Sequence, residues 1–173
     1  QLHRTIEETY LYQARFDLAD HHLRAALDTY QQLVGEQDPE FARSADLLAA
    51  LLILKGDYFN AQSLSEQALA VYRREYPRGR VPASWYVAGL SESGLLKMTA
   101  GDIPSAEVPF REALDIGPKL VGNDRALIAI VLGNLGKARE GQGDFNEAES
   151  LYRQSIEVYR ALPGRQRLEL GTS

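Results

Sequence analysis

The feature that most constrains the fold of this chain is a short segment that recurs along it. Three copies begin with Gly-Asp: GDYFNAQSLSEQALAVY, GDIPSAEVPFREALDIG and GDFNEAESLYRQSIEVY. A weaker copy, ARFDLADHHLRAALDTY, precedes them. A fixed period of a few tens of residues predicts stacked supersecondary units. The central alanines, spaced 42, 45 and 42 residues apart, are Ala19, Ala61, Ala106 and Ala148.

Each copy has the periodicity of an amphipathic helix. Positions four, seven and eleven residues after the central alanine lie on one helix face. Small residues at the alanine and at position seven allow a neighbouring helix to approach closely, and larger residues at positions four and eleven fill the space beside it. The predicted packing stripe consists of Leu23, Ala26 and Tyr30; Ser65, Ala68 and Tyr72; Phe110, Ala113 and Gly117; and Tyr152, Ser155 and Tyr159.

Three of the copies open with a sequence that is typical of a turn between two helices. Glycine suits a helix C-terminus that takes a left-handed backbone conformation, and the aspartate after it is a natural N-cap for the next helix. The bulky apolar residue that follows is expected to plug the elbow. Each copy is therefore predicted to be the second helix of a helix–turn–helix. The residues are Gly56, Asp57 and Tyr58; Gly101, Asp102 and Ile103; and Gly143, Asp144 and Phe145.

The first helix of each pair lies upstream of the copy. Before Gly56, the dipeptide Asp38-Pro39 provides a cap followed by a proline suited to the first helical position. Comparable segments precede the third and fourth copies, whereas the first unit keeps only QLHRTIEETYLYQ, so its opening helix is predicted to be short or truncated. The chain is predicted to be all-α, with eight helices in four antiparallel pairs and no strands. We expect one repeat domain, residues 1–173, with units at about 1–36, 37–79, 80–122 and 123–163, and with 164–173 as a tail or the start of a further unit.

Two proline-containing segments depart from the repeat. The three extra residues between the second and third copies fall in YPRGRVP, Tyr76 to Pro82, which is predicted to be a loop. Pro118 follows Gly117, which replaces the tyrosine of the other copies. Because a proline inside a helix removes a backbone donor and clashes with the preceding turn, this helix is predicted to kink or end early.

The composition excludes several classes of protein. With 45% hydrophobic and 25% charged residues, the chain has the composition of a folded globular protein. It has no apolar run of the ~18 residues that a spanning helix needs, so no membrane insertion is predicted. A net charge of −5 without a Lys/Arg run disfavours nucleic-acid binding. The lack of cysteine excludes disulfides, thiolate nucleophiles and cysteine metal ligands.

We find no catalytic, cofactor-binding or metal-binding pattern in the sequence. His21 and His22 are adjacent, so on a helix they point about 100° apart and cannot both ligate one metal ion. The serines of GLSESG lack the G-x-S-x-G spacing of a nucleophile elbow, and GQG lacks the third glycine of a dinucleotide-binding loop. The prediction is a non-enzymatic protein with no cofactor and no metal.

The fourth unit, LGNLGKAREGQGDFNEAESLYRQSIEVY, resembles the tetratricopeptide repeat. The 42-residue period resembles the kinesin-light-chain type of this repeat, whose helices are longer. The resemblance implies a right-handed α-α superhelix of four helix pairs, whose first helices line a concave groove that binds peptides or partner helices. The family pattern corresponds to Leu132, Leu135, Gly136, Arg139 (in an aromatic position), Gly143, Ala148, Tyr152 and Ser155.

The resemblance also implies which residues line the groove. Asn134 matches the asparagine that kinesin-light-chain-type repeats place against a ligand backbone. Trp85 and Tyr86 have two possible interpretations: they are interface anchors, or they pack in the seam between neighbouring units. The implied groove residues are Arg4, Glu8, Leu11, Tyr12, Arg43, Asp46, Leu47, Ala50, Leu54, Ser91, Glu92, Leu95, Met98, Asn134, Lys137 and Glu140.

Two functional hypotheses follow. The first is a protein–protein interaction scaffold whose groove binds an extended or helical segment with apolar anchors and some basic residues. The second is a regulatory or sensor segment of a larger bacterial signalling protein, linked to a kinase or an ATPase. Because the sequence stops at RQRLELGTS, where a fifth unit would start, we expect either further repeats or end-to-end self-association. The compartment stays open, with the cytoplasm slightly favoured.

Overall fold

The structure is a computed structural model that describes residues 16–162. Within that range the chain forms seven α-helices and three single-turn 3-10 helices, and it contains no strand. The all-α prediction is confirmed. The expected first helix, in residues 1–13, lies outside the described residues. The chain divides into two compact units, unit 1 (residues 1–85) and unit 2 (residues 86–173).

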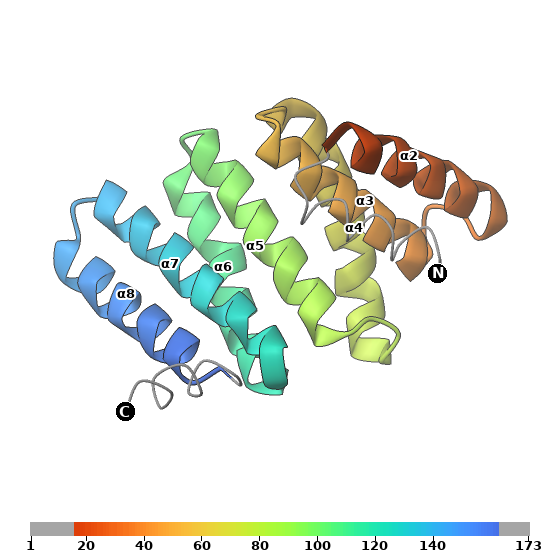
Figure 1. Cartoon of the computed structure of the whole chain (residues 1–173). Helices are drawn as coiled ribbons and strands as arrows, with labels where there is room; N and C mark the ends of the chain where they lie inside the picture. Colours follow the sequence, from red (N-terminus) through yellow and green to blue (C-terminus); the bar gives the residue numbers. More distant parts are fainter. Residues whose placement is uncertain (1–15, 163–173) are drawn as a thin grey trace, which may run out of the picture. The chain divides into compact units, whose positions relative to one another are not determined.

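In unit 1 the central element is α3 (Pro39–Leu54), which packs against both α2 (Phe16–Leu33) and α4 (Tyr58–Glu75) (Figure 1). Most of the side chains of α3 are buried, as expected for a helix with a neighbour on two sides. Asp38 caps it as predicted, because its carboxylate accepts the Glu40 amide N–H at 2.9 Å. The 3-10 turn η1 (Tyr76–Arg78) follows α4.

Unit 2 contains four helices, of which α5 begins with residues 83–85 of unit 1. The pairs α6 with α7 and α7 with α8 pack side by side (Figure 1). Two 3-10 turns lie between α6 and α7. The elements are α5 (Ala83–Thr99), α6 (Ile103–Ile116), η2 (Gly117–Lys119), η3 (Gly122–Arg125), α7 (Ala126–Gly141) and α8 (Phe145–Arg160).

The predicted caps are confirmed at α4, α6 and α8. In each case an aspartate oxygen accepts the backbone N–H three residues later at 3.2 Å. The glycine before each aspartate has a φ angle between 79° and 82°, a conformation that residues with a Cβ rarely adopt. The capping residues are Asp57, Asp102 and Asp144, and the glycines are Gly56, Gly101 and Gly143.

The predicted packing stripe is also confirmed. The central alanines are buried in all four copies. Within the stripe, Tyr72 and Phe110 are fully buried, whereas Tyr152 and Tyr159 of the last copy are half-buried. Small residues face these rings at close range: a Cβ added to Gly94 would lie 2.3 Å from the Phe110 ring. The stripe therefore fixes how closely neighbouring helices approach.

The prediction of an apolar plug at the elbow is wrong for two of the three residues, Tyr58 and Phe145. Tyr58 is 46% exposed and Phe145 is 68% exposed, while Ile103 is half-buried. The elbows are closed instead by backbone hydrogen bonds. At the first of them, the Gly56 N–H donates to the Ile53 carbonyl at 3.0 Å and the Asp57 N–H donates to the Leu52 carbonyl at 2.9 Å. Because this arrangement satisfies the last carbonyls of the first helix, no side-chain plug is needed.

The two departures from the repeat behave as the prolines predict. The helix α6 ends at Ile116, and Gly117-Pro118 opens η2. The connection 76–82 includes η1, and its Val81 is buried. Part of this connection is therefore packed against the rest of the protein rather than exposed. Pro109 lies inside α6 without ending it.

Candidate functional site

The implied groove residues of the first unit lie outside the described residues. These are Arg4, Glu8, Leu11 and Tyr12. The remaining twelve fall on α3, α5 and α7.

In unit 1 the implied residues of α3 differ in their accessibility. Leu54 is 65% exposed, and Arg43 and Ala50 are half-buried. Leu47 is only 8% exposed and Asp46 only 1% exposed. Arg43, Ala50 and Leu54 are therefore the accessible members of this set on α3, whereas Asp46 and Leu47 are buried.

Asp46 is held in a buried polar cluster rather than on an open face. Its Oδ2 accepts from the Arg43 guanidinium at 3.0 Å and from the Tyr72 hydroxyl at 3.3 Å. The Arg43 guanidinium also lies 5.4 Å from the centroid of the Trp85 ring, within the range of a cation–π interaction. These contacts give Asp46, Arg43 and Trp85 a packing role in unit 1.

In unit 2 the implied residues lie on α5 and α7. The Asn134 amide donates to the Ser91 hydroxyl at 3.4 Å, so α5 and α7 meet at this level. Glu92, Leu95 and Met98 follow along α5 and are half-buried, whereas Lys137 and Glu140 follow along α7 and are exposed. Ile130, an exposed residue of α7, lies one turn before Asn134. We refer to Glu92, Leu95, Met98, Ile130, Asn134, Lys137 and Glu140 as the α5–α7 face.

Glu140 is linked to the packing stripe of the last copy. Its carboxylate accepts the Tyr152 hydroxyl at 2.8 Å. Burial, and then this hydrogen bond to Glu140, raises the pKa of Tyr152 above its ordinary value. A hydrogen bond that holds the neutral phenol in place also fixes Glu140 on the α5–α7 face.

The His, Asp and Glu side chains of residues 16–162 do not gather into a metal site. In that range there is no group of three or more His, Asp or Glu side chains that could hold a metal ion. His21 and His22 lie near the surface of α2, with ring centroids 5.7 Å apart. None of the helices described is both long and apolar enough to cross a membrane.

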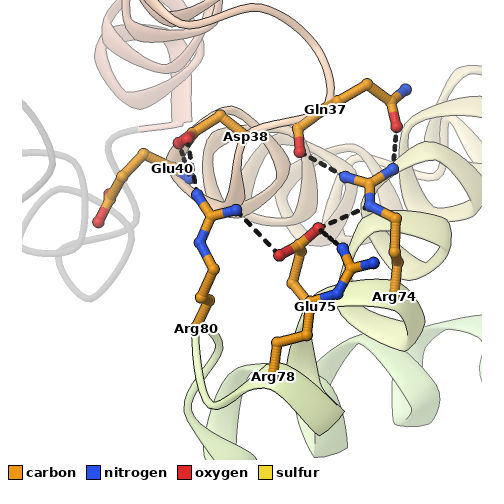
Figure 2. Close-up of polar contacts among 7 residues, drawn as sticks. All are labelled: Gln37, Asp38, Glu40, Arg74, Glu75, Arg78 and Arg80. Carbon is orange, nitrogen blue, oxygen red and sulfur yellow. Dashed lines mark hydrogen bonds and ion pairs between the residues drawn. The ribbon is translucent and has the colours of Figure 1, made fainter.

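A cluster of charged residues that the sequence reasoning missed lies at the end of α4 (Figure 2). The buried Glu75 carboxylate accepts from Arg74 at 2.7 Å, from Arg78 at 2.9 Å and from Arg80 at 3.0 Å. The hydrogen bond from Arg74, followed by the charges of Arg78 and Arg80, holds the pKa of Glu75 below its ordinary value. We refer to these four residues as the Glu75 cluster.

The arginines of the Glu75 cluster extend to the turn before α3. Arg74 donates to the side chain and the backbone carbonyl of Gln37, and Arg80 lies 3.6 Å from the Asp38 carboxylate (Figure 2). Because each guanidinium already has a carboxylate or amide partner, the cluster is a structural brace for the long connection 76–82. The sequence signal that could have revealed it is the single glutamate among three arginines in REYPRGR.

Arg139, which stands where the repeat usually has an aromatic residue, has a comparable role in unit 2. Its guanidinium pairs with Glu107 of α6 and lies 3.1 Å from Glu147 of α8. Arg111 adds a weaker pair with Glu147 at 3.5 Å. An ion-pair network thus replaces the aromatic ring in holding α6, α7 and α8 together.

Comparisons with known proteins agree with this architecture. One tetratricopeptide-repeat family model matches residues 86–161, and a second matches residues 8–40 and 41–79. No curated protein sequence matches the chain. Tetratricopeptide repeats are generally protein-interaction modules and typically non-catalytic scaffolds.

Several solved structures share the fold. BtubC (BKLC) from P. vanneervenii is 21% identical with a TM-score of 0.74, and the match covers 92% of this chain and 62% of that one. Tetratricopeptide-like repeats of Podosopora anserina, described as a kinesin light chain, are 18% identical with a TM-score of 0.64 over 91% of this chain and 74% of that chain. MamA is 16% identical with a TM-score of 0.61 over 90% of this chain and 75% of that chain.

This chain spans less than two thirds of the length of BtubC. At these identities the solved structures show the fold, an α-helical solenoid, and the two family models together match most of the sequence. The chain therefore belongs to the tetratricopeptide-repeat family.

Proposed function

We propose that this chain is a protein-interaction scaffold that binds a peptide or a partner helix on the α5–α7 face. The observation that carries the proposal is the mixture of accessible side chains on this face. Ile130 is 43% exposed one turn before Asn134, while Leu95 and Met98 are half-buried. The opposite sides of α5 and α7, including Leu90 and Leu135, are fully buried in unit 2. The face therefore offers apolar anchoring points on a rigid support.

The polar residues of the α5–α7 face indicate the kind of ligand. The Asn134 amide has further donor and acceptor capacity beyond its bond to Ser91, which suits a ligand backbone. The acidic Glu140 and Glu92 favour a basic residue, and Leu95 and Met98 favour an apolar one. The proposed ligand is an extended or helical segment with apolar anchors and some basic residues. In unit 1, Ala50 and Leu54 of α3 are accessible and offer apolar surface.

The test is a binding selection with a display library of short peptides against the whole chain. Peptides enriched on the wild type are then measured by fluorescence polarisation against Met98→Glu and Ile130→Glu. Each variant places a charge where an apolar anchor would contact the ligand, so we expect a loss of about tenfold or more in affinity. Leu47 is unsuitable for this test, because a charge at a buried position would unfold unit 1.

The matched control is Val108→Glu, which makes the same kind of change at an exposed apolar residue of α6. We expect it to bind like the wild type. Circular dichroism of all three variants establishes that they are folded. Equal affinity of the Met98 and Ile130 variants and the wild type, or a selective loss in the Val108 variant, would sink the proposal.

A further inference from the structure

A pocket of about 480 Å³ lies in unit 2 where the third copy departs from the repeat. It is lined by the end of α6, the turn η2 with the following Leu120, Arg125 of η3, the first turn of α7 and Val158 of α8. None of its lining residues belongs to the α5–α7 face. Its volume is within the range of about 300–1,000 Å³ that is usual for ligand pockets.

The pocket has an identifiable origin in the sequence. Tyr72, the residue at the equivalent position of the second copy, is fully buried and fills its site with a ring. Gly117 has no side chain to do this, and Pro118 turns the chain away into η2. Ile128 takes part of the vacated space, because a Cβ added to Gly117 would lie 2.7 Å from its Cδ1. The pocket is the part of this space that Ile128 does not fill.

The pocket is lined by apolar side chains and by one positively charged side chain. Leu114, Leu120, Ile128 and Val158 supply aliphatic surface, and Arg125 is the charged lining residue. Arg125 is exposed, and its side chain makes no hydrogen bond or ion pair with any residue in the range 16–162. A guanidinium of this kind is suited to a two-point pair with a carboxylate.

We propose that this pocket binds a protein segment in which an aromatic side chain stands next to an aspartate or glutamate. The ring occupies the site that the tyrosine ring occupies in other copies of the repeat. The neighbouring carboxylate pairs with Arg125 at the rim. The pocket is thus a second binding site, for an acidic aromatic motif, beside the α5–α7 face with its preference for basic residues.

The test uses a defined probe, a nonapeptide of glycine and serine with a central Phe-Glu pair. The chain is labelled with ¹³C at isoleucine, leucine and valine methyl groups, and the methyl signals of Ile128 and Val158 are followed during titration. We expect both to shift with the Phe-Glu peptide. Replacing the pair by Ala-Glu or by Phe-Lys is expected to weaken binding about tenfold or more, since each removes one half of the recognition.

Two variants examine the pocket from the protein side. Arg125→Glu changes an exposed residue and is expected to weaken Phe-Glu binding about tenfold or more, while improving Phe-Lys binding. Val158→Trp fills the pocket and is expected to abolish the shift at Ile128. Arg153→Glu, a charge reversal at an exposed position of the same helix outside the pocket lining, is the control and should leave binding unchanged.

Three outcomes would overturn the inference. One is the absence of shifts at Ile128 and Val158 at ~1 mM Phe-Glu peptide, a concentration that detects weak binding. The second is equal binding of the Phe-Glu and Phe-Lys peptides. The third is a set of shifts confined to Leu95 and Ile130, which would reject the pocket and support the α5–α7 face instead. Failure of the proposed function, by contrast, would show in Met98→Glu and Ile130→Glu without affecting the pocket.

Discussion

At the scale of single residues, this chain is organised by close approaches between small residues and rings. Gly94 of α5 lies against Phe110, and Gly136 of α7 lies against Tyr152. Both glycines lie inside helices, where glycine is less favourable than alanine, but the lack of a side chain lets each approach its ring closely. Gly133 lies one turn from Gly136, yet a Cβ there would meet only the Ser155 hydroxyl at 3.8 Å. The two kinds of helical glycine should therefore respond to substitution in opposite ways.

The first prediction compares Gly94→Ala with Gly133→Ala. At Gly94 the added methyl group would lie 2.3 Å from a fully buried ring, so we expect a loss of about 1–3 kcal/mol in the free energy of unfolding. At Gly133 there is room for the methyl group, and helix propensity should raise stability by about 0.5–1 kcal/mol. Urea unfolding followed by circular dichroism measures both. A Gly94 variant as stable as the wild type would show that the close approach is absent.

The second prediction concerns the Glu75 cluster. Glu75→Gln keeps the shape of the side chain but removes the charge that three arginines share, so we expect a lower melting temperature at neutral pH. Because the pKa of Glu75 is lowered in the folded chain, its contribution is fully present above the unfolded-state pKa of about 4.3. The contribution is lost as the pH falls through the lower folded-state pKa.

The measurement is the difference in melting temperature between the wild type and Glu75→Gln at pH 7 and at pH 3. We expect the difference to shrink in acid. Lys97→Gln, a change of one charge on α5 away from this cluster, serves as the control for general charge effects. A difference that is the same at both values of pH would contradict the assignment of Glu75 as an ionised, buried brace.

At the scale of helices and turns, the repeat carries its own start and stop signals. Asp57, Asp102 and Asp144 begin the second helices, and hydrogen bonds from the residues three positions later hold the pKa values of Asp57 and Asp102 below their ordinary range. The turn before each aspartate is closed by backbone hydrogen bonds. The bulky residue after the aspartate does not have to close the turn, and at two of the three turns, those of Tyr58 and Phe145, it is exposed.

The third prediction tests the caps. Asp144→Ala removes the oxygen that accepts the Glu147 N–H at 3.2 Å and should lower the free energy of unfolding by about 1 kcal/mol. Asp115→Ala, at an exposed position in the last turn of α6, should change it by less than about 0.5 kcal/mol. Denaturant unfolding of the two variants measures the difference. Equal effects would mean that the hydrogen bond to Asp144 does not matter for α8.

The elements could be predicted from the sequence because their causes are local. Caps depend on neighbouring residues, and the stripe depends on a spacing of three or four residues along one helix. The burial of Asp46 and the ion pairs of Arg139 could not be predicted, because each depends on a residue of another helix, Tyr72 in one case and Glu107 in the other. The prediction of a plug at Tyr58 was wrong because local backbone hydrogen bonds are enough to close the turn without a buried side chain.

At the scale of the whole molecule, the residues that recur in every copy are those that pack the helices together. The residues that differ between the copies are the ones that we propose to bind ligands. The buried stripe recurs in every copy, including α8 with Ala148 and Ser155. The first helices differ: α5 has Leu95 and Met98 at the positions where α7 has Lys137 and Glu140. The pocket beside Gly117 likewise occurs where one copy departs from the others. On this account, binding is a property of the positions that do not repeat.

One measurement tests this account most directly. Met98 is the single methionine of the chain, so labelling with ¹³C-methyl methionine gives one signal, located on the α5–α7 face. A peptide selected against the wild type should shift this signal in a saturable way, and Ile130→Glu should reduce the shift at the same peptide concentration. A peptide that binds with full affinity and leaves the Met98 signal unchanged would contradict the central claim.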